Sequence, residues 1–343
     1  MREQSTSSAQ LLEVKDLVVQ FETSDGPVHA VNHLHLSLNK GETLALVGET
    51  GAGKTTSALA VMGLIDSPPG HIRQGEIWFQ GINLLELEEE VYRSYRGSRI
   101  SMIFQDPMTA LNPVLPVVEQ IAETIANHQK VSDAAAEERA IEMLELVRIP
   151  AERAYDYPHQ FSGGMKQRVV IAIALACNPQ LLIADEPTTA LDVTIQAQVL
   201  EMMKELRDRL DTSMLMITHD LGVVAEVADK VAIMYAGEII ESGTLEDIFL
   251  TPSHPYTVGL FRSIPKLDEE VEFLAQIEGI MPDPSDLPSG CPFHPRCKYA
   301  EPICGTTKPE LTTLSGDDHK VQCLIYEGGL RMKELPKGDL PNV

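Results

Sequence analysis

The sequence predicts an α/β fold with a helical insertion, followed by a small loop-rich domain. Short apolar runs alternate with helical patterns along residues 11–245, as expected for a largely parallel sheet that helices cover on both faces. Between about residues 107 and 177 strand signals vanish and helical periodicity takes their place. After residue 245 prolines recur, and four of the five cysteines lie there. These observations predict a core, an inserted helical subdomain and a separate C-terminal domain.

Each expected strand is a short run rich in apolar or β-branched residues, and each expected helix shows a 3.6-residue period. Strands are predicted within residues 12–21, 28–38, 44–47, 75–82, 100–104, 181–184, 214–217, 231–235 and 238–240. Helices are predicted over residues 56–64 and 194–210, and around residues 140–147 after an N-cap at Ser132 or Asp133. A turn at Ala236-Gly237 joins the last two strands into a hairpin.

The same patterns give the boundaries along the chain. Residues 1–10 are rich in Ser and Gln and are expected to be disordered. Residues 11–245 are expected to form the α/β domain, with its helical subdomain at about 107–177. Residues 246–343 are expected to form the Cys- and Pro-rich C-terminal domain.

Residues 48–55 read GETGAGKT, which is a complete phosphate-binding loop. The glycines let the backbone wrap closely around an anion, so that successive N–H groups point at the phosphates. Lys54 is expected to reach the β- and γ-phosphates of a nucleotide, and the Thr55 hydroxyl to bind Mg²⁺. An apolar strand before the loop and a helix after it complete the motif. The residues predicted to contact the nucleotide here are Gly48, Glu49, Thr50, Gly51, Ala52, Gly53, Lys54, Thr55 and Thr56.

The composition argues against several classes of protein. A formal net charge of −24 disfavours binding to a nucleic-acid backbone and direct adsorption to anionic lipid. No run approaches the ~18 apolar residues of a membrane span, and the N-terminus lacks the apolar stretch of a signal peptide. We therefore expect an intracellular protein that another protein holds at any membrane where it works.

Two further motifs suggest phosphoryl-transfer chemistry. The apolar run 181–184 ends in Asp185 and Glu186, which are expected to join the Mg²⁺ shell and to polarise the attacking water, respectively. Ser162-Gly163-Gly164 opens a predicted helix, whose N-terminus offers a hydroxyl and backbone N–H groups to an anion.

The order of these motifs carries more information than any one of them. The loop is followed by Gln105, the segment 162–167 (SGGMKQ), Asp185-Glu186, Ala190-Leu191-Asp192 and His219. In this order and at these spacings, residues 11–245 resemble the ATP-binding subunits of ATP-binding-cassette (ABC) transporters. The resemblance implies an ABC-type nucleotide-binding domain of the P-loop NTPase fold. Two departures, Phe161 for leucine and Met165 for glutamine, leave Ser162-Gly163-Gly164 intact.

The resemblance also implies roles. Glu186 matches the catalytic base, His219 the histidine that holds the γ-phosphate, and Asp185 the metal-associated aspartate. Gln105 matches the glutamine that contacts Mg²⁺ and the attacking water and senses the membrane subunit. Phe21 matches the aromatic residue that stacks on adenine, although a place in a strand core explains it equally well.

In the same family, one subunit completes the nucleotide site of another. The matching residues are Ser162, Gly163, Gly164 and Asp192. The chain has one phosphate loop and one such signature, so the resemblance implies that it hydrolyses ATP only as a dimer of cassettes.

A narrower resemblance covers residues 161–168, 183–193, 251–260 and 291–297, the last reading CPFHPRC. These segments are similar to bacterial oligopeptide and dipeptide transporter ATP-binding subunits. They imply a peripheral ATPase at the cytoplasmic face of the bacterial inner membrane that drives peptide import. The implied partners are a second ATP-binding subunit (a heterodimer), two permeases and a periplasmic or extracellular binding protein. An importer of nickel, glutathione or another small ligand stays an alternative, and a soluble ABC ATPase acting on nucleic acid a more distant one.

The proline-punctuated stretch 105–116 leads from a strand into the helical insertion. An apolar surface there is costly without a partner. We expect this loop to dock a short helix of the permease; a buried connector is the alternative.

Four cysteines of the tail lie within 33 residues, namely Cys291, Cys297, Cys304 and Cys323. Cys177 stands apart as an expected core thiol. A loop-rich domain has little hydrophobic core, so a metal cross-link would supply folding free energy. The spacing fits neither ferredoxin nor zinc patterns and leaves iron–sulfur, zinc and free thiols open. Some peptide-importer subunits carry a cluster in this tail, so the resemblance favours a [4Fe–4S] cluster over Zn²⁺.

Overall fold

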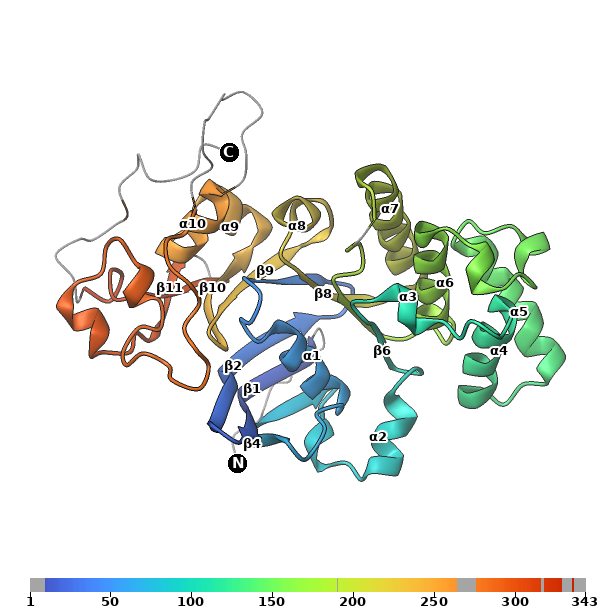
Figure 1. The fold of residues 1–343 in the computed structure, drawn as a ribbon, viewed down its shortest axis with the longest axis horizontal. Coiled ribbons are helices and arrows are strands. Elements are labelled where there is room, and N and C mark those ends of the chain that lie inside the picture. Colours follow the sequence, from blue (N-terminus) through green and yellow to red (C-terminus); the bar gives the residue numbers. More distant parts are fainter. Residues whose placement is uncertain (1–9, 190, 264–275, 316–317, 329–334, 336–343) are drawn as a thin grey trace.

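The computed structural model describes residues 10–189, 191–263, 276–315, 318–328 and 335. Figure 1 shows an elongated molecule with the helical subdomain at one end and the C-terminal region at the other. The N-terminal antiparallel sheet lies below the centre in this view. Among the described helices, none is both long and apolar enough to span a membrane. Disorder was predicted for residues 1–10. Residues 1–9 lie outside the described residues, and Gln10 begins the first strand.

The central sheet has eight strands in the order β11-β12-β10-β9-β3-β8-β7-β6. Five neighbours are parallel and almost wholly buried, which explains why they read as continuous apolar runs. They are β9 (Lys230–Tyr235), β3 (Thr43–Val47), β8 (Ser213–Thr218), β7 (Leu181–Asp185) and β6 (Ile100–Ile103). The predicted hairpin of β9 with β10 (Glu238–Thr244) is antiparallel and turns at Ala236-Gly237.

A second, antiparallel sheet has the order β2-β1-β4-β5. Its strands are β1 (Gln10–Thr23), β2 (Gly26–Asn39), β4 (Gly70–Phe79) and β5 (Ile82–Asn83). Together with α1 (Lys54–Met62), this sheet packs on one face of the central sheet. The short elements η1 (Leu84–Glu86) and α2 (Glu89–Tyr95) follow. The phosphate-binding loop therefore sits where the two sheets and α1 meet.

The predicted helical insertion is present on the other face of the central sheet. It comprises α3 (Pro107–Ala110), α4 (Val117–His128), α5 (Asp133–Leu146), η2 (Ala151–Arg153), η3 (Pro158–Gln160) and α6 (Gly163–Leu175). Ser132 caps α5, as its side chain accepts a hydrogen bond from the Ala135 N–H. Helices α7 (Val193–Leu210) and α8 (Leu221–Val227) pack with this group into one apolar core.

The C-terminal region contains α9 (Leu245–Leu250), α10 (Pro255–Arg262), η4 (His294–Arg296) and η5 (Pro302–Gly305), followed by β11 (Leu311–Ser315) and β12 (His319–Gln322). β11 pairs with β12, and β12 pairs with β10, so the hairpin of β11 and β12 extends the central sheet. The buried Glu241 carboxylate of β10 accepts hydrogen bonds from the Ser253 and His254 N–H groups and contacts His319. The C-terminal region is thus joined closely to the sheet, while a domain boundary near residue 245 stays a prediction.

Candidate active site

The phosphate-binding loop connects β3 to α1, and its glycines have steric reasons. A Cβ at Gly48 would lie 2.2 Å from the Met234 carbonyl oxygen, and one at Gly53 would lie 2.4 Å from the Ala30 carbonyl oxygen. Gly53 also has a φ of 104°, which side chains rarely adopt. Close backbone approach at both ends therefore gives the loop the form of an anion cradle.

Lys54 is buried in this cradle, with 6% of its surface exposed. Its ammonium group donates to the carbonyl oxygens of Gly48, over 2.7 Å, and of Glu49, over 3.0 Å. Burial lowers the pKa of Lys54, and the nearby carboxylates of Glu186 and Asp185 oppose that shift. The loop thus holds a cation in reach of oxygen acceptors, which is the arrangement that nucleotide phosphates require.

Asp185 ends β7 beside the start of α1 and fits the metal role predicted for it. It is 2% exposed, and its Oδ1 has no hydrogen-bond partner within the described part of the chain. Burial raises the pKa of Asp185, while a hydrogen bond with Thr55 lowers it. A buried carboxylate oxygen without a partner, beside a hydroxyl, is a ligand set suited to Mg²⁺ with nucleotide phosphates.

Three predicted catalytic residues meet at Glu186. Its Oε1 lies 2.9 Å from His219 Nδ1, and its Oε2 accepts a hydrogen bond from Gln105 Nε2 over 2.9 Å. Thr189 donates to the same Oε2 over 3.0 Å, a contact that the sequence did not suggest. Burial alone would raise the pKa of Glu186, but the hydrogen bonds from His219, Thr189 and Gln105 hold it below its ordinary value. The carboxylate is therefore ionised and able to accept a proton.

The signature residues, Ser162 to Gly164 with Asp192, differ in their surroundings from the residues at the phosphate-binding loop. Ser162 caps α6, accepting a hydrogen bond from the Met165 N–H, and Asp192 caps α7 in the same way. A Cβ at Gly163 would meet open space, whereas one at Gly164 would meet Ile195. In Figure 1, α6 lies toward the helical end and α1 at the centre. A cavity of about 240 Å³ lies at the loop, and no signature residue is among the described residues that line it. Its lining residues are Val47, Gly48, Glu49, Thr50, His219, Leu221 and Leu260.

Phe21 pairs with Val28 and Gly70 in the antiparallel sheet. Its ring is close to Gly70 and packs against the core between the two sheets. Phe21 is half-buried there, so both its place in the strand core and its contact with adenine stay predictions. Ala190, part of the motif before Asp192, lies outside the described residues.

Two residues of the C-terminal region also contact the loop, and no sequence pattern indicated these contacts. Arg296 forms an ion pair with Glu49 at 2.7 Å, and the Tyr256 hydroxyl accepts a hydrogen bond from the Glu49 N–H over 2.9 Å. Both lie in segments, HPY and CPFHPRC, that mark the narrower resemblance. A local pattern does not reveal a partner more than 200 positions away.

Known proteins share both parts of this architecture. Residues 31–189 match the family model described as ABC transporter, and residues 240–304 match that described as the oligopeptide/dipeptide transporter C-terminal region. The oligopeptide transport ATP-binding protein OppD of Bacillus subtilis is 54% identical over 95% of this chain and 92% of its own length. The oligopeptide transport ATP-binding protein OppD of Escherichia coli is 51% identical over 87% of this chain and 89% of its own.

A solved structure supports the same comparison. A dimeric ATP-binding cassette in a post-hydrolysis state, bound to ADP and phosphate, aligns with a TM-score of 0.62 at 26% identity. The alignment covers 68% of this chain and 99% of that cassette.

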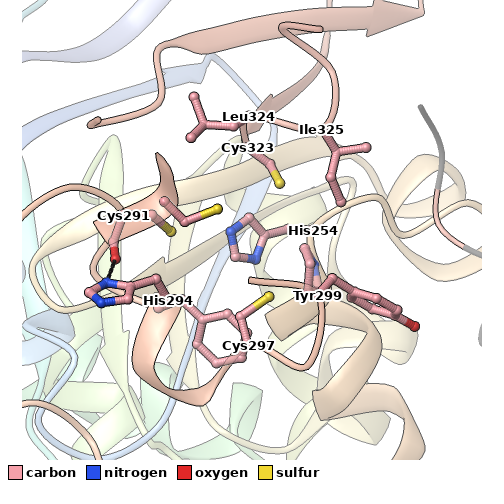
Figure 2. Close-up of a pocket in the computed structure, with 11 residues that line it drawn as sticks. His254, Cys291, His294, Cys297, Tyr299, Cys323, Leu324 and Ile325 are labelled. Atoms are coloured by element: carbon pink, nitrogen blue, oxygen red, sulfur yellow. Dashed lines mark hydrogen bonds between the residues drawn. The ribbon is translucent and has the colours of Figure 1, made fainter. Parts of the chain in front are cut away.

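The prediction of a [4Fe–4S] cluster is wrong. Cys291, Cys297, Cys304 and Cys323 do line one cavity of about 20 Å³ (Figure 2). However, no three or more His, Cys, Asp or Glu side chains among the described residues are placed to hold a metal ion, and the relatives above are plain transport ATP-binding proteins. The same finding leaves the zinc alternative without support.

The physical reason lies in the surroundings of these thiols. Burial raises the pKa of Cys291 and Cys323 to about 12 and that of Cys297 to about 11. As free groups they are neutral thiols, and their burial among apolar side chains accounts for them without a metal. Cys304 and Cys323 pack with apolar side chains such as Val258 and Leu324. The cysteines therefore contribute to the small apolar core of the C-terminal region.

Proposed function

This chain belongs to the family of oligopeptide and dipeptide ABC transporter ATP-binding subunits, and we propose that its phosphate loop and Glu186 cluster form the catalytic half-site of a peptide importer. The chain hydrolyses ATP to ADP and phosphate and drives import at the cytoplasmic face of the inner membrane. The observation that carries the residue assignment is the Glu186 carboxylate, which contacts both Gln105 and His219 beside the loop.

Each part of the cluster has a chemical task. Lys54 and the loop N–H groups hold the phosphates, and Glu186 orients the attacking water and accepts its proton. His219 and Gln105 fix the Glu186 carboxylate and keep it ionised. Thr55, Asp185 and Gln105 would hold Mg²⁺. When bound with ATP, the ion would supply positive charge that offsets the negative charge developing during phosphoryl transfer.

The nucleotide site is completed by a second cassette. We propose that the signature of this chain, Ser162 to Gly164 with Asp192, faces the nucleotide of a partner ATP-binding subunit, forming a heterodimer. Support comes from the exposure of Ser162, Gly163 and Asp192 and from the similarity to a cassette solved as a dimer. Two permeases and a binding protein outside the membrane complete the proposed importer.

The loop from Gln105 to Pro116 is the proposed contact with the permease. Val114 in this loop is 74% exposed, and Phe104 just before it is 47% exposed. Apolar side chains at such a site favour a protein partner. A Val114→Cys variant should cross-link to the permease in the assembled transporter, whereas Val91→Cys on α2, 44% exposed, should not. Cross-linking at position 91 with none at 114 would contradict this docking site.

Transport in proteoliposomes tests the whole proposal. The chain is reconstituted with its permeases, partner cassette and binding protein, and uptake of labelled di- and oligopeptides is measured with and without ATP. We expect ATP-dependent peptide uptake that Glu186→Gln abolishes. Uptake of nickel or glutathione but not of peptides would favour the alternative ligands. Normal uptake by the Glu186→Gln variant would overturn the assignment of the catalytic base.

A further inference from the structure

The C-terminal region forms one wall of a cavity at the phosphate-binding loop. Leu260 of α10 lines the same cavity as Gly48, Glu49 and His219. Two other residues of the region, Arg296 and Tyr256, reach the loop directly. The contacts converge on Glu49, the second residue of the phosphate-binding loop.

Arg296, the last residue of η4, holds the Glu49 side chain through two hydrogen bonds. Nη1 donates to Glu49 Oε2 over 2.7 Å, and Nη2 donates to Oε1 over 3.1 Å. The Arg296 side chain is 5% exposed. Its remaining N–H groups donate to the Glu278 and Ile277 carbonyl oxygens and to the Tyr235 hydroxyl. Because the fork of the guanidinium is held on several sides, it fixes the Glu49 carboxylate in one orientation.

Tyr256 of α10 holds the backbone of the same residue. Its hydroxyl accepts a hydrogen bond from the Glu49 N–H over 2.9 Å. The Tyr256 ring is fully buried and packs edge-on against Tyr235 and Phe293, with ring centroids 4.7 and 5.4 Å apart. A buried aromatic cluster therefore supports the backbone of the loop at Glu49.

An unpaired carboxylate at position 49 would oppose anion binding. The loop receives a polyphosphate through its N–H groups and Lys54, and a free negative charge beside them repels that ligand. The ion pair with Arg296 neutralises this charge. The Glu49 carbonyl oxygen also accepts a hydrogen bond from Lys54, so the position of Glu49 affects the lysine as well.

We propose that Arg296, together with Tyr256, is a positioning residue for the phosphate-binding loop, so that docking of the C-terminal region raises the nucleotide affinity of the same chain. This inference rests on the assignment of residues 48–55 to the phosphates under the proposed function. A loop released from these contacts binds nucleotide only in the fraction of molecules that keep the competent shape. By linkage, bound nucleotide in turn stabilises the docked C-terminal region.

The test measures binding of Mg-ADP to the full-length chain by calorimetry. Arg296→Gln is expected to raise the Kd about tenfold, because the Kd rises tenfold if only about a tenth of the molecules keep the loop in its binding-competent shape. Arg296→Lys, which keeps the charge and the stem, should give a smaller rise. Lys308→Gln is the control, because Lys308 joins the C-terminal region to the sheet through its ion pair with Glu238 and not through a residue of the loop. Its Kd should equal that of the unchanged chain.

A second readout separates positioning from general loss of structure. In the assembled transporter, Arg296→Gln should raise the KM for ATP while kcat stays within about twofold, because the Glu186 cluster is not altered. The double variant with Arg296→Gln and Glu49→Gln should bind Mg-ADP no more weakly than the weaker-binding of the two single variants. The reason is that both substitutions break the same contact. If Arg296→Gln does not fold, the Kd of Arg296→Lys decides.

Three outcomes would overturn the inference: an unchanged Kd in the Arg296 variants, an equal rise in the Lys308→Gln control, or additive effects of the Glu49 and Arg296 changes. Lys54→Ala distinguishes this failure from that of the proposed function. If Lys54→Ala loses Mg-ADP while the Arg296 variants bind it normally, only the role of Arg296 is wrong. If Lys54→Ala also binds normally, the loop assignment itself fails.

Discussion

The phosphate-binding loop and the signature are both assigned to ATP, but this chain surrounds them very differently. Around the loop, Lys54 is buried on carbonyl oxygens and Asp185 is almost inaccessible. Glu186 is held by three other side chains. At the signature, Ser162 and Gly163 are exposed, and a side chain at Gly163 would meet open space.

This difference shows which half of the chemistry the chain completes alone. Buried charged groups need partners, and the chain supplies them for Lys54 and Glu186, whereas Asp185 Oδ1 has none among the described residues. An exposed helix N-terminus has free N–H groups and can satisfy them on an anion carried by another molecule. The loop side is therefore a preformed half-site, and the signature side is a surface for a neighbour.

The sharpest test of this contrast changes the loop side. Glu186→Gln in the assembled transporter should lower kcat about 10²- to 10⁴-fold, the range for loss of a general base, and leave ATP bound. Lys54→Ala should instead lose mainly nucleotide affinity, because its charge binds ground state and transition state alike. Binding by filtration and phosphate release measure the two effects. Equal loss of binding in both variants would show that the roles are wrongly assigned.

A second test removes the neighbour. The isolated chain should hydrolyse ATP slowly, and adding the partner cassette and permeases should raise the rate by about 10- to 100-fold, because orientation of the second half-site is then fixed. Turnover per site is compared for the chain before and after assembly, with its monomeric state verified by light scattering. Full turnover by a monomer would contradict the division into half-sites.

The sequence indicated which residues of the loop side lie close together, because these residues follow strand ends. Gln105, Glu186 and His219 come just after β6, β7 and β8, which are parallel neighbours in the sheet. The carboxyl ends of parallel strands share one edge, so residues over 100 positions apart are brought together. The buried strands themselves were visible as apolar runs.

Other features depended on contacts that no local pattern encodes. β4 begins at Gly70, five residues before the predicted run, because antiparallel pairing with β1 includes polar residues such as His71. The pairing of Arg296 with Glu49 spans 247 positions. The four tail cysteines were expected to bind one metal centre, and that prediction is wrong: they line one cavity, but no metal-binding group is found among the described residues.

The signature side is tested by comparing two helix caps. Ser162→Ala and Ser132→Ala each remove a side chain that caps a helix, α6 and α5 respectively, and each should cost about 1 kcal/mol of stability. Only Ser162→Ala should lower hydrolysis in the assembled transporter, by roughly tenfold, through the loss of one phosphate contact. Nucleotide binding by the isolated chain should not change in either variant. Equal activities of the two variants would place the signature outside the active site.

The smallest expected effect concerns Thr189, whose hydroxyl donates to Glu186 Oε2 over 3.0 Å. This hydrogen bond favours the ionised carboxylate and helps to keep the pKa of Glu186 low. Thr189→Val removes it and keeps the shape of the side chain, so the pKa of Glu186 rises. Since the base acts when ionised, activity is lost as the pH falls through that pKa, and the acid limb of kcat moves to higher pH.

At neutral pH the change should be modest, roughly twofold to fivefold in kcat, because His219 and Gln105 still hold Glu186. Thr189→Ser is the matched control, since it keeps the hydroxyl and should restore both the rate and the position of the acid limb. Phosphate release by the assembled transporter, measured from pH 5 to 8, makes the comparison. An acid limb that does not move in Thr189→Val would mean that Glu186 is held ionised by His219 and Gln105 alone, and that Thr189 only packs beside it.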